Sequence, residues 1–199
     1  MKIEPLAVPG AWVCSPQVYG DDRGSFAEWY RDDLLRAATG RRFEVVQANH
    51  SVSRRGVVRG VHFADVPPGQ AKYVYCPVGA FVDIVVDLRV GSPTFGAVDS
   101  VRLDDADQRA VFIAEGIGHV LCALADGSSA NYLVSTPYNP AVERTISPLD
   151  PALGLPLPED LGDLVLSEKD AAAPTLEQAI NSGILPTYEN CLARYGELA

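Results

Sequence analysis

The stretch Gly-Val-Val-Arg-Gly-Val-His-Phe-Ala-Asp-Val-Pro-Pro-Gly-Gln-Ala-Lys-Tyr-Val-Tyr-Cys, residues 56–76, is the most informative part of this chain. Two runs rich in valine and aromatic residues flank a Pro-Pro-Gly loop, a pattern typical of two β-strands joined by a turn. These strands carry three basic side chains, Arg59, His62 and Lys72. Strands of an all-β domain normally carry apolar or small polar residues, so inward-facing cations need an anionic or acidic partner. The stretch therefore predicts a binding or catalytic site.

Similar short runs fill the middle of the chain, separated by Gly, Pro, Asp or Ser clusters. Their spacing of about 8–12 residues predicts an all-β sandwich or barrel rather than βαβ units. The expected strands cover residues 43–49, 57–63, 70–76, 80–88, 97–103, 110–113, 117–124 and 129–135.

The strand expected over residues 80–88 has the clearest alternation. One of its faces is wholly apolar, and the other includes two carboxylates. This parity predicts a packed outer side and a more polar inner side, as in a barrel that holds a ligand. The first face holds Val82, Ile84, Val86 and Leu88, and the second holds Phe81, Asp83, Val85 and Asp87.

Few segments of the sequence have a helical pattern. Residues 32–39 form one short candidate. Near the end of the chain, Thr175 and Gln178 have capping-box spacing, which predicts a helix of about two turns that ends near Gly183. Residues 137–170, rich in Pro and Asp, predict a long irregular cover. We find no internal repeat, so residues 1–199 are expected to form one domain.

Composition excludes several function classes. A formal net charge of −10 argues against a nucleic-acid partner, although a few Arg and Lys side chains in a cleft can still hold a pyrophosphate. No apolar run reaches the ~18 residues of a membrane span, and no signal peptide is visible. The four cysteines form no C-x-x-C pair, so we expect them to be reduced and mostly buried in a cytoplasmic protein. They are Cys14, Cys76, Cys122 and Cys191.

His62 is the first candidate for a general base. Arg59 and Lys72 on adjoining strands would disfavour its charged form and leave a neutral imidazole. Arg59 and His62 are three residues apart, so a regular strand would point them to opposite faces. A bulge at Gly60 would bring both inward.

Two further residues could act with His62. Tyr132, in a late strand, is either a packed sheet tyrosine or an acid that faces His62 across a cavity. Asp170 is either a solvated loop acid or the carboxylate that fixes the tautomer of His62. Asp83 could serve His119 in the same way, a weaker pairing that we leave outside the catalytic set.

Other polar groups could line a cavity. They are Arg23 and Glu28 in an alternating segment, and Gln47 with Asn49 on a later strand, where an exposed β-face is the alternative. Tyr138, in the expected cover with Glu143, could stack on a nucleobase.

These motifs together resemble the nucleotide-sugar 3,5-epimerases that act on dTDP-4-keto-6-deoxyglucose. The similarity runs from about residue 10 to about residue 186, with its markers in order. The markers are D-D-R-G-S-F-x-E at 21–28, Q-A-N at 47–49, R-G-V-H-F at 59–63, A-K-Y-V at 71–74, D-I-V-V-D-L-R-V-G-S-P-T-F-G at 83–96, G-I-G-H at 116–119, the strand of Tyr132, T-P-Y-N-P-A-V-E at 136–143 and L-S-E-K-D at 166–170.

The resemblance implies a cupin-type jelly-roll barrel, a homodimer, and no metal or nicotinamide cofactor. It implies that His62 is the base with Asp170 as its partner, that Tyr132 is the acid, and that Lys72 stabilises an enolate. The implied substrate contacts are Arg59 and His119, with Gln47, Ala48 and Asn49 lining the pocket. Tyr138 would stack on thymine, with Glu143 and Lys169 as further contacts. Arg23, Phe26 and Glu28 would contact the nucleotide across the dimer interface.

Two departures from the family pattern leave the outcome of the reaction open. The chain reads G-I-G-H-V-L at 116–121 and S-P-L-D-P at 147–151, and both resemble the branch serving antibiotic deoxysugar pathways, where C3, C5 or both are inverted. A metal-dependent cupin is one alternative, although no H-x-H is present. A non-catalytic nucleotide-sugar-binding jelly roll is the other, although it has no need of base, partner and acid together.

Overall fold

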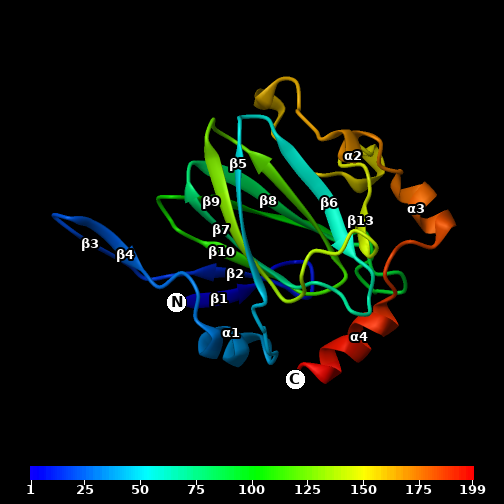
Figure 1. The fold of residues 1–199 in the computed structure, drawn as a ribbon, viewed down its shortest axis with the longest axis horizontal. Coiled ribbons are helices and arrows are strands. Elements are labelled where there is room, and N and C mark those ends of the chain that lie inside the picture. The colour runs from blue at the N-terminus through cyan, green and yellow to red at the C-terminus, as the bar shows by residue number, and fades with distance from the viewer.

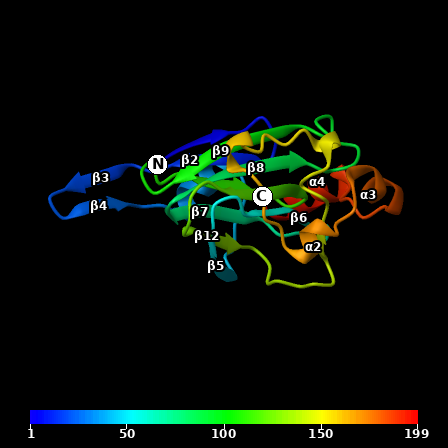
Figure 2. The same ribbon diagram turned by 90° about the horizontal axis from the view of Figure 1, so that it is seen from above.

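Two antiparallel β-sheets face each other in the computed structural model of this protein, which describes residues 1–199 (Figures 1 and 2). The six-stranded sheet has the order β1 (Lys2–Pro5), β2 (Ala11–Ser15), β10 (Ala110–Ile113), β7 (Lys72–Val78), β12 (Ser128–Val134) and β5 (Gln47–Ser53). The five-stranded sheet has the order β13 (Glu143–Thr145), β6 (Val58–Ala64), β11 (Ile117–Ala123), β8 (Ala80–Asp87) and β9 (Val98–Asp104).

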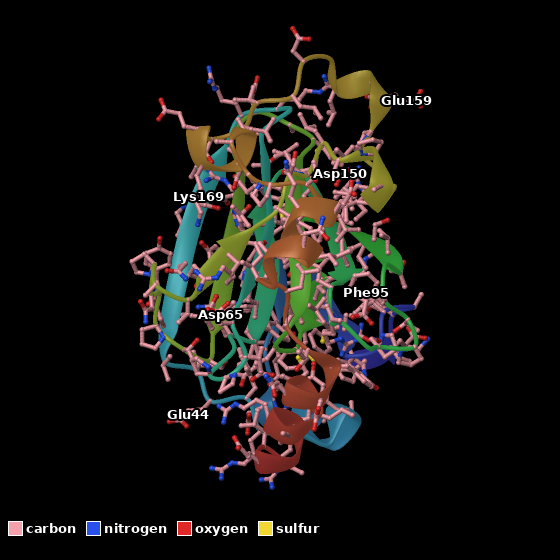
Figure 3. All side chains as sticks on the ribbon, turned by 90° about the vertical axis from the view of Figure 1, so that its right-hand side faces the viewer. Glu44, Asp65, Phe95, Asp150, Glu159 and Lys169 are labelled. Carbon is pink, nitrogen blue, oxygen red and sulfur yellow. The ribbon has the colours of Figure 1, made fainter.

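The hydrophobic core lies between the sheets and on the outer face of each sheet. Between the sheets, Phe81 and Val85 of β8 pack in a cluster with Val74 and Val111 of the opposite sheet. Tyr73 and Phe112 point to the other face of that sheet, where they pack with Trp29, Tyr30 and Phe43. On the outer side of the five-stranded sheet, Ile84 and its strand neighbours pack under residues 146–185. The parity predicted for residues 80–88 is therefore confirmed, with an apolar outer face and the two carboxylates inside. Figure 3 shows the covering segment, in which Asp150, Glu159 and Lys169 are labelled.

One predicted strand was misplaced. The strand expected over residues 43–49 begins at Gln47 and continues to Ser53, where it pairs with β12. Phe43 instead lies outside any strand, and its ring packs against those of Tyr30 and Phe112. Residues 50–53 are polar apart from Val52, so their side chains alone do not predict a strand, and backbone pairing with β12 holds them in one.

A hairpin of β3 (Val18–Asp21) and β4 (Gly24–Ala27) projects from the sheets at the left of Figure 1. Tyr19 and Phe26 on this hairpin are 61% and 65% exposed. Two large aromatic side chains held away from the core indicate a surface for contact with another molecule.

The helices lie at the periphery. Helix α1 (Asp32–Thr39) matches its predicted range, and α3 (Leu176–Ser182) has the predicted capping box of Thr175 and Gln178 and ends at Gly183. The irregular cover predicted over residues 137–170 also contains β13, α2 (Glu168–Ala171) and 3-10 turns at Pro151–Leu153 and Glu159–Leu161.

Helix α4 (Tyr188–Glu197) was not predicted, because only Cys191 of its residues is buried and its apolar period is weak. All four cysteines are free and buried, as predicted. None of the helices combines the length and the apolar character that a membrane-crossing helix needs.

Candidate active site

A bulge in β6 turns two basic side chains toward one cavity. His62 pairs with His119 of β11, but Arg59 pairs with Leu121, so β6 has one extra residue between the two pairs. Gly60 lies at this point with φ of +145°, and a Cβ there would lie 2.6 Å from the carbonyl oxygen of His119. Only glycine fits this backbone. The predicted bulge is confirmed, and Arg59 and His62 line the same cavity.

The cavity has two connected parts that share Arg59, His62 and Tyr132. The outer chamber has a volume of about 470 Å³, and its lining includes the predicted residues Arg59, His62, Tyr132, Tyr138, Glu143, Lys169 and Asp170. The inner chamber has a volume of about 120 Å³ and is lined by Ser51, Arg59, His62, Lys72, His119, Leu121 and Tyr132.

His62 is held by the carboxylate predicted as its partner. Nε2 of His62 lies 2.8 Å from Oδ1 of Asp170, whose side chain is only 4% exposed. The backbone N–H of Asp170 donates to the Ser167 hydroxyl, and Thr145 donates to Oδ1. Because the Asp170 carboxylate accepts a hydrogen bond from Nε2–H, Nδ1 of His62 is left as the basic nitrogen.

The pKa values of this pair move in the direction that a base requires. Burial lowers the pKa of His62 below its ordinary value, and the charge of Lys72 acts in the same direction, while the hydrogen bond to Asp170 opposes both. Burial acts to raise the pKa of Asp170, but the hydrogen bond and charge of His62, together with the hydrogen bonds from Ser167 and Thr145, lower it below its ordinary value. Near neutral pH the pair therefore consists of a neutral imidazole and a carboxylate.

Tyr132 and Lys72 reach the cavity from the six-stranded sheet, opposite His62. Burial raises the pKa of Tyr132, so its phenol keeps its proton. Burial lowers the pKa of Lys72, while Glu143 and Asp83 act to raise it. The strands of His62 and Lys72 were expected to adjoin, but β6 and β7 belong to different sheets and face each other across the interior. The charge of Lys72 reaches His62 through this space.

His119 belongs to the inner chamber and has its own carboxylate. Its Nε2 lies 2.9 Å from Oδ2 of Asp83. His50, the third histidine, lies on β5 with Nδ1 at 2.6 Å from the side-chain oxygen of Asn131, so the three histidines do not converge. No group of three or more His, Cys, Asp and Glu side chains has the arrangement of a metal site.

Of the remaining predicted contacts, Tyr138 and Glu143 line the outer chamber, whereas Gln47, Ala48 and Asn49 lie on β5 and are not among its lining residues. Gln47 donates to the side chain of Asn49 at 2.7 Å and accepts from the backbone N–H of Tyr138 at 3.1 Å. Glu143 accepts from Gln70 at 3.2 Å. Ala48 is exposed between Gln47 and Asn49 on the edge strand.

Three predicted nucleotide contacts lie away from the cavity. Arg23 and Phe26 are on the projecting hairpin and line a hollow of about 350 Å³ there. Glu28 follows the hairpin and pairs with Arg31 at 3.3 Å. Within one chain, these side chains do not meet the catalytic candidates.

Sequence reasoning missed Ser51, Gln70 and Ser167. Ser51 lines the inner chamber with a buried hydroxyl that has no partner. Gln70 orients Glu143, and Ser167 caps α2 and so positions Asp170. The parity of β5 could have indicated Ser51, because it follows Gln47 and Asn49 at intervals of two residues.

Comparisons with known proteins agree with this geometry. Residues 5–178 match the family described as dTDP-4-dehydrorhamnose 3,5-epimerase. A dTDP-4-dehydrorhamnose 3-epimerase from Streptomyces niveus is 50% identical over 97% of this chain and 92% of that relative. This chain belongs to the dTDP-4-dehydrorhamnose 3,5-epimerase family. The predicted family and the predicted isomerase class are confirmed.

Two solved structures of family members resemble this chain along its whole length. The rmlC epimerase of Mycobacterium tuberculosis has a TM-score of 0.97 and 48% identity, with 100% of both chains covered. ChmJ, a 3'-monoepimerase from Streptomyces bikiniensis in complex with dTDP-quinovose, has a TM-score of 0.94 and 43% identity, with 98% of both chains covered. The similar family members thus include both a 3,5-epimerase and 3-epimerases.

Proposed function

We propose that this protein inverts C3, C5 or both carbons of a dTDP-4-keto-6-deoxyhexose, by deprotonation to an enolate and reprotonation from the opposite face. One observation carries the proposal. His62 and Tyr132 line the same cavity from opposite sheets. A sugar ring between them would have a base on one face and an acid on the other, which inversion requires.

His62 acts as the general base in this mechanism. A C4 ketone acidifies the hydrogens on C3 and C5, and Nδ1 of His62 removes one of them as an enolate forms. Asp170 then holds the resulting imidazolium through Nε2. The low pKa of His62 keeps the imidazole free to accept the proton at neutral pH.

Lys72 stabilises the enolate and Tyr132 completes the inversion. A cation already placed near the ketone oxygen lowers the barrier, since it needs no reorganisation as charge develops. Lys72 lines the inner chamber, which supports this role, and Arg59 and His119 in the same lining would be further substrate contacts. Tyr132, protonated because burial raises its pKa, donates to the carbanion from the other face.

The nucleotide occupies the outer chamber, in our proposal, and the site is completed by a homodimer. Tyr138 is 61% exposed at the rim and can stack on thymine, with Glu143 and Lys169 beside it and Gln47, Ala48 and Asn49 along the adjoining strand. Arg23, Phe26 and Glu28 lie on or beside a hairpin that projects from the chain, so they can reach the nucleotide bound by a partner subunit.

We infer that residues 1–199 form one cupin-type jelly-roll domain. Strand order supports this: β10-β7-β12-β5 in one sheet and β6-β11-β8-β9 in the other follow the double Greek key of an eight-stranded jelly roll. The four free cysteines support a cytoplasmic location. In the reaction that we propose, the residues of this chain carry both proton transfers without a cofactor.

The first test is proton NMR of dTDP-4-keto-6-deoxyglucose with the protein in deuterated water. Deuterium at C3 and C5, with a rhamnose-configured product after reduction, identifies a double epimerase. Deuterium and inversion at one carbon identify a monofunctional enzyme. No washout above the enzyme-free control contradicts the proposal and supports a binding-only protein.

Tyr132→Phe tests the assignment of the acid. The variant is expected to exchange substrate hydrogen with solvent through His62, but to lose inversion, because no proton can arrive from the opposite face. The two readouts come from the same NMR spectra. Inversion at the wild-type rate would remove Tyr132 from this role.

A further inference from the structure

His119, which lines the inner chamber, and Asp83 behind it form a second histidine–carboxylate pair that the proton transfers do not use. Nε2 of His119 lies 2.9 Å from Oδ2 of Asp83, and the Asp83 side chain has no exposed surface. The other oxygen of this carboxylate, Oδ1, is buried without a hydrogen-bond partner. A buried carboxylate with an unpaired oxygen is costly, so a purely structural role explains it poorly.

The pair lies next to the proposed catalytic residues. His119 is directly opposite His62 in the pairing of β11 with β6, and Asp83 is opposite Leu121 in the pairing of β11 with β8. Lys72 faces them from the other sheet and lines the same chamber. Asp83 is therefore in the wall behind the groups that would meet the reacting end of the sugar.

Two consequences follow from this placement. The Asp83 carboxylate accepts a hydrogen bond from Nε2–H of His119, which leaves Nδ1 as a free acceptor for a sugar hydroxyl. Asp83 is also a buried negative charge near Lys72, and it acts to raise the pKa of that lysine against the lowering by burial. A protonated Lys72 donates to the ketone oxygen, whereas a neutral one loses most of its effect on the enolate.

We propose that Asp83 is a positioning residue for enolate formation, which fixes the tautomer of His119 and supplies the buried counter-charge of Lys72. The proposal rests on the proposed function, because the enolate is its target. Through these two groups, Asp83 organises one acceptor and one donor around adjacent oxygens of a 4-keto sugar.

The test compares Asp83→Asn with a matched control, Asp87→Asn. Both carboxylates are buried on β8, but Asp87 bonds to Arg89, Ser92 and Thr94 and does not line the cavity. Asp83→Asn is expected to lower kcat for deuterium washout by about 10- to 100-fold, with KM and the affinity for dTDP changed less than about threefold. Asp87→Asn is expected to lower stability but to retain kcat. An equal loss of kcat in both variants would overturn the proposal.

Nitrogen NMR reads the tautomer directly. The chain has three histidines, so ¹⁵N-histidine labelling yields three ring systems. In the wild type, His119 is expected as the Nε2–H tautomer, and in Asp83→Asn as a mixture of tautomers. A wild-type His119 protonated on Nδ1 alone would overturn the proposal, even if the variant failed to fold.

The pH profile gives a third readout. In Asp83→Asn the alkaline limb of kcat is expected to move to lower pH, since Lys72 loses a charge that raises its pKa. The titratable and charged groups that face Lys72 are Arg59 and His62 of β6, Asp83 of β8, His119 of β11, Tyr132 of β12, Glu143 of β13 and Lys169 of α2. An unmoved limb contradicts the counter-charge role.

A wrong proposed function and a wrong role for Asp83 would give different experimental results. If the proposed function is wrong, wild-type protein shows no washout with dTDP-4-keto-6-deoxyglucose, while the His119 tautomer can still be measured. If only this inference is wrong, the wild type shows washout and Asp83→Asn matches it in kcat.

Discussion

Among the regions of this molecule that bury charged side chains, two treat them in opposite ways. In the first, Asp87 accepts hydrogen bonds from Arg89 at 2.8 Å, from Ser92 at 2.6 Å and from Thr94 at 2.6 Å, and the guanidinium of Arg89 also donates to Pro9 and Tyr195. The second region is the cavity around His62. There, Lys72 has no carboxylate within ion-pair distance, and one oxygen of Asp83 has no hydrogen-bond partner.

The difference separates charges that stabilise the fold from charges kept for a reaction. The closed network around Asp87 satisfies each oxygen, so it joins the β8–β9 connection to the C-terminal helix α4 through Tyr195. The cavity is left with donors and acceptors that a substrate can satisfy. Unsatisfied buried polar groups cost free energy and persist where they have a function.

Loss of the base should have the largest effect. His62→Asn is expected to lower turnover by about 10³- to 10⁴-fold, because Nδ1 no longer accepts a proton, while dTDP still binds in the outer chamber. Deuterium washout and dTDP titration measure the two properties. His50→Asn is the matched control, since His50 lies outside the cavity and should retain turnover. Washout by His62→Asn at the His50→Asn rate would remove His62 from the mechanism.

The closed network predicts a loss of stability instead. Asp87→Asn is expected to lower the free energy of unfolding by about 3–5 kcal/mol, because Arg89 is left buried beside a neutral partner. Urea denaturation measures the change, and deuterium washout at saturating substrate should remain near the wild-type rate. A loss below about 1 kcal/mol would mean that this network contributes no more than an exposed ion pair.

The partner of the base should have a smaller effect, with a pH signature. Asp170→Asn is expected to lower kcat by about 100-fold, because the tautomer of His62 is no longer fixed. Asp170 acts to raise the pKa of His62, so its removal lowers that pKa further. The base works when neutral, so the acid limb of kcat/KM moves to lower pH in the variant. A limb displaced to higher pH would contradict the pairing.

Much of the candidate site was predictable from local sequence. The R-G-V-H-F segment indicated its own bulge, because Arg59 and His62 can share a face only if Gly60 breaks the alternation. The alternation of apolar and acidic residues predicted the inner and outer faces of β8. Thr175 and Gln178 predicted the start of α3, and Gly183 predicted its end. These signals are local, since they depend on periodicity and on backbone conformation within a few residues.

Other parts depended on distant partners. Strand β5 is set by pairing with β12, about eighty positions away, and α4 is held largely by Arg41 over the Tyr195 ring and by the hydrogen bond from Tyr195 to Glu115. Neither kind of contact produces a hydrophobic period in the local sequence from which the element could be predicted. The placement of Lys72 opposite His62, rather than beside it, also follows only from the division of β6 and β7 between two sheets.

The sequence by itself determined the residue types of the chemistry, the β-rich class and the family, because side-chain identity and short-range periodicity are written along the chain. Only the tertiary structure decided which of these groups share a cavity. It joined His62 to Asp170 across 108 positions and His119 to Asp83 across 36, and it brought Tyr132 into the same cavity from the opposite sheet. The physical reason is that burial and hydrogen bonding act through space, so the pKa of His62 depends on neighbours that the linear order does not reveal.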